Sequence, residues 1–78
     1  MENKIIEIIC KVCEDESIKD NLEIDLLETE KLDSLGFINL ITILEDEFDI
    51  EIQPTLVPVD TWRSVFKIIN LVESLISE

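Results

Sequence analysis

The chain has 78 residues and a formal net charge of −13, from 19 acidic and 6 basic residues. Apolar residues make up 46% of it, enough to fold around a core and more than disordered chains contain. The charge argues against binding to nucleic acids or anionic membranes, because their phosphates would be repelled. The chain has no histidine, the commonest general base, so we do not expect it to be an enzyme by itself.

The first predicted element is a helix from Glu2 to about Glu14, in which apolar residues recur every three or four positions. Acidic residues interrupt this segment, which argues against a signal peptide, and the apolar runs of the chain are too short to span a membrane. Cys10 and Cys13 have the spacing of a redox pair or of half a zinc site, but the second half is missing. We interpret them as packed thiols of a cytoplasmic protein.

Residues 15–33 follow no single period and are expected to form a long first loop, which scattered aliphatic side chains hold to the core. A second helix is predicted from Ser34 to about Phe48, with Asp33 as its N-cap. Its core face carries Phe37, Leu40, Ile41, Leu44 and Phe48. Leu35 and Ile38 lie off that face, so either the long loop or a partner covers them.

Both prolines of the chain lie in residues 49–60, which they should stiffen as an extended connection. Asp60 could cap a short helical turn through Trp62, and we expect the indole to pack in or beside the core. A last helix is predicted from about Ser64 to Ile76. Residues 1–78 therefore predict a single domain, a small all-α bundle of three long helices plus one short helix.

The candidate site is the junction of the long loop with the second helix. A phosphate ester on the Ser34 hydroxyl would meet free backbone N–H groups and the positive end of the helix dipole. Gly36, two residues further on, would leave room for a partner to approach. An Asp-Ser-Leu helix start is common, however, and on its own it does not establish a site.

The surrounding stretch LDSLGFINLITILEDEFDIEI resembles the attachment region of acyl carrier proteins, in which Asp-Ser-Leu opens the second helix. It looks closer to the D-alanyl carrier proteins of lipoteichoic acid D-alanylation. The residues that suggest this subfamily are Asp25-Leu26, Gly36, Phe48-Asp49-Ile50, Thr55, Asp60, Trp62 and Lys67-Ile68-Ile69. Glu30 departs from the pattern, because carriers usually have a glycine there. Gly36 and Asn39 stand where fatty-acid carriers often have carboxylates.

The resemblance implies that a phosphopantetheinyl transferase, with Mg²⁺, esterifies Ser34 with 4′-phosphopantetheine from coenzyme A. Asp33 would help to position the metal or the serine. The thiol of the arm would hold an aminoacyl or acyl group as a thioester. A D-alanine-activating, adenylating ligase would load it and an acyltransferase would unload it. The chain would be a monomeric, cytoplasmic carrier without a catalytic residue or an intrinsic metal.

An acidic cluster surrounds the end of the second helix and consists of Glu45, Asp46, Glu47, Asp49 and Glu51. It is either a solvated helix end or a landing patch for basic protein surfaces. Negative charge opposes the dipole at a helix C-terminus, which favours the landing patch. The predicted partner-recognition residues are Leu35, Gly36, Ile38, Thr42, Glu45, Asp46 and Asp49.

Two alternatives stay open. A fatty-acid, polyketide or nonribosomal acyl carrier would use the same arm, and the loading enzyme selects the cargo. A small acidic interaction protein that mimics nucleic acid would fit the size and the charge. The serine at a helix start, with apolar neighbours, fits only a carrier.

Overall fold

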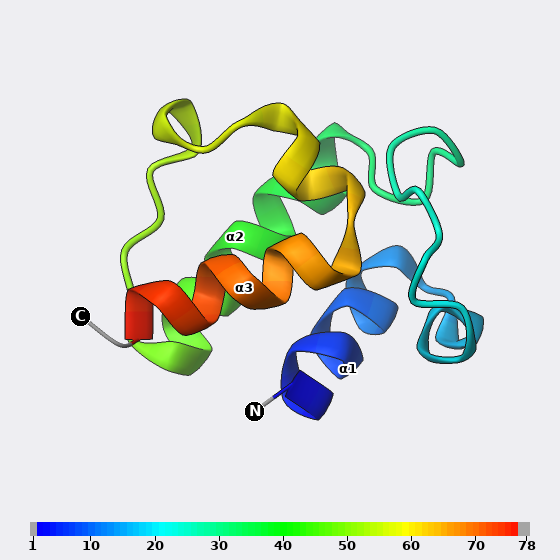
Figure 1. Cartoon of the computed structure of the whole chain (residues 1–78), viewed down its shortest axis with the longest axis horizontal. Coiled ribbons are helices and arrows are strands. Elements are labelled where there is room, and N and C mark those ends of the chain that lie inside the picture. Colours follow the sequence, from blue (N-terminus) through cyan, green and yellow to red (C-terminus); the bar gives the residue numbers. More distant parts are fainter. Residues whose placement is uncertain (1, 77–78) are drawn as a thin grey trace.

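The computed structural model describes residues 2–76, and within them lie the α-helices α1 (Glu2–Cys13), α2 (Ser34–Phe48) and α3 (Val65–Ile76). Short 3₁₀ helices interrupt the two connections: η1 (Glu16–Asp20) in the first, and η2 (Pro54–Leu56) and η3 (Val59–Arg63) in the second. Figure 1 shows α1, α2 and α3 gathered at the centre, with both connections looping around the outside. The expected all-α bundle with three long helices is confirmed, but residues 2–76 contain three short helices where one was predicted, and η1 and η2 lie in segments expected to be a loop and an extended connection. In residues 2–76 no helix has both the length and the apolar character needed to cross a membrane.

The core lies where the three α-helices meet. Its fully buried side chains recur every three or four residues along each helix, so each helix turns one apolar face inward. They include Ile5 and Ile9 of α1, Leu40 and Leu44 of α2, and Val65, Ile68 and Val72 of α3. The free thiol of Cys10 is buried in the same core, and that of Cys13 is half-buried beside it. Burial raises the pKa of Cys13 to about 11, as expected for a packed thiol.

The first connection is held to the core as predicted, because Ile18, Leu26 and Leu32 are buried. Its second half is also tied to η3 by Asp25. The Asp25 carboxylate accepts the backbone N–H of Glu28 at 2.9 Å and pairs with Arg63 Nη1 at 3.1 Å. These partners hold the pKa of Asp25 below its usual 3.8. The long loop thereby lies against the second connection.

Helix α2 has the predicted bounds, and Asp33 is its N-cap: Asp33 Oδ1 accepts the Gly36 N–H at 2.7 Å. The other end closes with Asp49 in the left-handed conformation, at φ 52°. Its N–H donates to the Glu45 carbonyl. Aspartates next to the helix therefore cap both of its ends, each through one hydrogen bond.

The short helix predicted near Trp62 is the 3₁₀ helix η3, but Asp60 does not cap it. Pro58 precedes η3, which places Asp60 inside the helix, where its carboxylate lies 3.2 Å from Arg63 Nε. Trp62 is buried, as expected, and its ring and that of Phe37 form a T-shaped pair with 5.1 Å between centroids. This contact packs η3 onto α2.

Candidate functional site

Ser34 opens α2 and its side chain is exposed. The first amides of a helix have no acceptor within the helix. Asp33 Oδ1 accepts the backbone N–H of Gly36. The backbone N–H groups of Ser34 and Leu35 therefore remain for an acceptor outside the helix. A phosphate ester on Ser34 would therefore lie at the positive end of the helix dipole, next to free donors.

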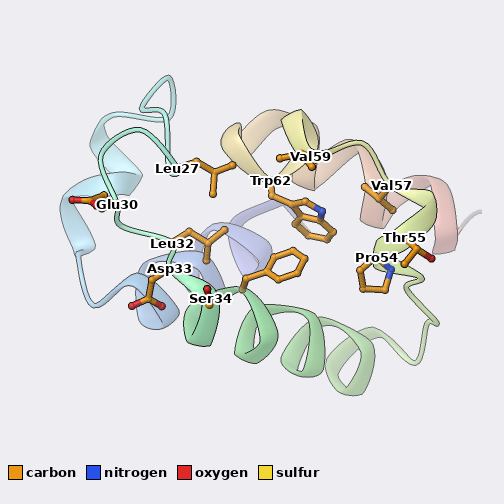
Figure 2. Close-up of a pocket in the computed structure, with 11 residues that line it drawn as sticks. Leu27, Glu30, Leu32, Asp33, Ser34, Pro54, Thr55, Val57, Val59 and Trp62 are labelled. Carbon is orange, nitrogen blue, oxygen red and sulfur yellow. The ribbon is translucent and has the colours of Figure 1, made fainter.

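Ser34 also lies at one end of a groove with a volume of about 620 Å³. Three segments that are far apart in the sequence line it (Figure 2). The first connection contributes Leu27 and Leu32, α2 contributes Ser34 and Phe37, and the second connection contributes Pro54, Val57, Val59 and Trp62. Sequence reasoning missed this groove, because no local pattern shows that residues 27–37 and 54–62 face each other.

Trp62 carries a polar atom without a partner. Its side chain is 3% exposed, and its Nε1 has no hydrogen-bond partner among residues 2–76. In Figure 2 the indole lies inside the groove, with its nitrogen turned toward the end formed by Pro54, Thr55 and Val57. The residues that line the groove thus combine an apolar surface with one buried donor.

Gly36 is buried by the chain itself, so the interpretation that it opens a path for a partner is wrong. A Cβ at this position would lie 3.2 Å from Asp33 Oδ1, 3.4 Å from Leu32 Cδ1 and 3.6 Å from Val12 Cγ1. The absent side chain instead lets the capping carboxylate and α1 approach the first turn of α2.

Leu35 and Ile38 are 73% and 59% exposed, which rules out the alternative that the long loop covers them. Thr42, Asp46 and Asp49 are exposed as well and follow at intervals of three or four residues. Residues at this spacing share one face of a helix, and Asp49 follows that face as the C-cap residue of α2. We call these five residues, Leu35, Ile38, Thr42, Asp46 and Asp49, the α2 stripe. It is apolar near Ser34 and acidic at the far end.

Two members of the acidic cluster have partners inside the chain, so the cluster is less free than the sequence suggested. Glu45 is half-buried, and its Oε2 accepts the backbone N–H of Ile52 at 2.9 Å. Glu47 Oε1 lies 2.8 Å from Lys4 Nζ of α1. Glu45 therefore ties the end of α2 to the second connection and is not freely available to a partner.

The fold and the site together define a phosphopantetheine carrier. The phosphopantetheine attachment site family matches residues 3–72, and the chain belongs to this family. Its prosthetic group is accordingly 4′-phosphopantetheine. Members of such a family carry groups and do not transform them, and they interact with transferases and ligases. The alternative of an acidic nucleic-acid mimic is thereby removed.

Relatives named D-alanyl carrier protein match the chain over most of its length. The protein of Bacillus subtilis (strain 168) is 30% identical over 74 residues, which are 95% of each chain. That of Latilactobacillus sakei is 31% identical over 75 residues, 96% of each chain. That of Abiotrophia defectiva is 35% identical over 68 residues, 83% of this chain and 86% of the relative.

Proposed function

We propose that residues 1–78 act as one carrier domain that holds D-alanine as a thioester, on a phosphopantetheine group attached to Ser34. The observation that carries the attachment site is the exposed Ser34 hydroxyl at the start of α2, beside a capping aspartate and free amides. The name shared by the relatives supports the cargo. When bound, the group supplies a thiol at a reach that no side chain offers.

The residues around Ser34 fit the modification reaction. Ser34 Oγ would form the phosphodiester while the nucleotide part of coenzyme A leaves, and the hydroxyl proton would pass to a base of the transferase. Asp33 uses Oδ1 for the helix cap, and its exposed carboxylate can offer an oxygen ligand to the Mg²⁺ of that reaction. Free amides of the first turn would then stabilise the phosphate.

The α2 stripe is the surface that we propose for the partner enzymes: a phosphopantetheinyl transferase, a D-alanine-activating ligase that adenylates its substrate, and an acyltransferase. Leu35 and Ile38 would supply an apolar centre, and Asp46 and Asp49 would attract basic surfaces. Coenzyme A and ATP are consumed in the cytoplasm, where we place this carrier as a monomer. A fatty acid or another acyl group remains the alternative cargo.

Intact-mass spectrometry tests the attachment site. After incubation with coenzyme A, Mg²⁺ and a phosphopantetheinyl transferase, the wild-type chain should gain the mass of one phosphopantetheine, and Ser34→Ala should gain none. Ser64→Ala is the matched control, because Ser64 directly precedes α3 but its Oγ already accepts the Lys67 N–H at 3.4 Å. Modification of Ser34→Ala, or its loss in Ser64→Ala, would show that the proposed site is wrong.

A loading assay tests the cargo separately. A D-alanine ligase with ATP should charge the modified chain, whereas an acyl carrier protein synthetase with a fatty acid should charge it poorly. Gly36 and Asn39 stand where fatty-acid carriers often have carboxylates, which is the reason to expect this difference. Equal charging by both enzymes would leave the carrier role intact and remove the preference for D-alanine.

A further inference from the structure

The buried indole nitrogen of Trp62 requires a partner that residues 2–76 do not provide. Buried donors in folded proteins are nearly always hydrogen-bonded, because a donor taken out of water without an acceptor destabilises the folded state. Indole Nε1 can only donate. The missing partner is therefore a hydrogen-bond acceptor that can reach the inside of the groove.

Water is a poor candidate for this partner. An ordered buried water needs two to four polar neighbours. The side chains that line the groove around the ring are mostly apolar, namely Phe37, Pro54, Val57 and Val59, and the hydroxyl of Thr55 is the one polar side chain at the end that the nitrogen faces. The carboxylates of the lining, Glu30 and Asp33, lie at the Ser34 end in Figure 2, whereas the nitrogen faces the opposite end. The site favours an acceptor carried by a largely apolar molecule.

The group attached at Ser34 has that chemistry and begins in the same groove. Phosphopantetheine combines amide carbonyls with aliphatic segments, and Ser34 itself lines the groove. Its tether gives it a high effective concentration there, of millimolar order. The volume of about 620 Å³ lies within the range of small-molecule sites, roughly 300–1,000 Å³.

The nitrogen is closed off from solvent, so the wall of the groove has to shift before an acceptor reaches it. The second connection forms this wall, and the hydrogen bonds within it are local. The backbone N–H groups of Leu56, Val57 and Thr61 donate to Gln53, Pro54 and Pro58, each only three residues back. Leu56 and Val59 are 74% and 68% exposed. Segments with local hydrogen bonds and exposed side chains are the ones that open at low cost.

On these grounds, and resting on the proposed attachment at Ser34, we infer that Trp62 Nε1 donates a hydrogen bond to an amide carbonyl of the phosphopantetheine group. The group then lies along the groove between α2 and the second connection when no partner enzyme holds it. Trp62 is a positioning residue, which sets where the arm rests and takes no part in the chemistry of the thioester.

Nuclear magnetic resonance of the indole group tests this inference directly. The chain has one tryptophan, so a ¹⁵N-labelled sample gives one indole N–H signal. That signal should move downfield and exchange more slowly with solvent in the modified chain than in the unmodified chain. In Ser34→Ala treated with the same transferase, it should stay where it is.

The same samples separate the two proposals. Intact mass reports whether the group is attached, independently of the indole signal. A wild-type chain that gains no mass would contradict attachment at Ser34. A chain that gains the mass but keeps an unchanged indole signal would overturn the role of Trp62 and leave the attachment site standing.

Trp62→Phe isolates the hydrogen bond, because it keeps an aromatic ring against Phe37 and removes the donor. Attachment should raise the thermal midpoint of the wild type more than that of Trp62→Phe. The difference between the two rises should be roughly 4–8 °C, which is the shift expected for one hydrogen bond in a domain of this size. An equal rise in both proteins would overturn the inference. If Trp62→Phe does not fold, the indole signal of the wild type still decides.

Discussion

Glu30 occupies a backbone conformation that side chains rarely adopt. Its φ is 59°, in the left-handed region that favours glycine. The sequence had shown only that a glycine typical of carriers is replaced here by glutamate. The structure gives the physical reason for that glycine: the first connection turns at this position, where the Glu30 N–H donates to the Leu27 carbonyl at 3.1 Å. The glutamate holds the turn at the expense of backbone strain.

Glu30→Gly should therefore stabilise the fold. Removal of the Cβ from a left-handed position relieves about 1 kcal/mol of strain, part of which the greater freedom of glycine in the unfolded chain offsets. The free energy of unfolding, measured with urea, should rise by roughly 0.5–1 kcal/mol.

Glu28→Gly is the matched control for this change. Glu28 is also an exposed glutamate of the first connection, and it is not among the described non-glycine residues with positive φ. The control removes the same charge but relieves no strain, so it should not stabilise the fold. Equal stabilisation by both changes would attribute the effect to charge and contradict the role of the backbone.

At the scale of elements, α2 both presents the site and holds the second connection in place. Its first turn exposes Ser34, and its last turn begins with the half-buried Glu45. Glu45 Oε2 binds the N–H of Ile52, whose side chain is 5% exposed. The second connection forms one wall of the groove, so this bond helps to define the groove from the opposite end of the helix.

Glu45→Ala should destabilise the fold by about 1–2 kcal/mol, because it leaves a partly buried N–H without an acceptor. Asp46→Ala removes the same charge from the next residue, which is exposed, and should change the free energy of unfolding by less than about 0.5 kcal/mol. Urea unfolding of both variants measures the difference. If the two values were equal, the bond to Ile52 would not contribute to stability.

At the scale of the whole molecule, charge acts on stability and on partner binding in opposite directions. The net charge of −13 is spread over a body of 31 × 24 × 18 Å. At 0.01 M salt the Debye length is about 30 Å, so repulsion acts across the whole molecule. Near 0.15 M salt the Debye length falls to about 8 Å, so the repulsion is largely screened.

Between these salt concentrations, the thermal midpoint of the carrier should therefore rise. Its association rate with a basic transferase should fall by about tenfold or more, because steering by the α2 stripe is screened. Calorimetry and stopped-flow measurements over one salt series check both trends. A midpoint and an association rate that rise together would contradict recognition by charge.

Two charge reversals locate the attraction. Asp46→Lys changes the acidic end of the α2 stripe and should slow association at low salt. Glu23→Lys makes the same change in the first connection, which lies at the other end of the molecule in Figure 1, and should affect the rate much less. Equal effects of the two reversals would show that net charge, and not the α2 stripe, steers the partner.

The sequence by itself determined the features that depend on neighbouring residues. Apolar spacing predicted α2 over Ser34–Phe48, and the capping chemistry of aspartate predicted the role of Asp33. Both follow from local rules of helix geometry and hydrogen bonding. The helical spacing also showed that Leu35 and Ile38 lie off the core face. It could not show whether the long loop covers them.

Only the tertiary structure decided what each residue meets across space. It buried Gly36 against Asp33, Leu32 and Val12, and it gave Glu45 a partner seven residues away. It also brought residues 27–37 and 54–62 together around the unpaired nitrogen of Trp62. The physical reason is that packing is shared among segments that are distant in the chain, so that no periodicity within one segment encodes where another will lie.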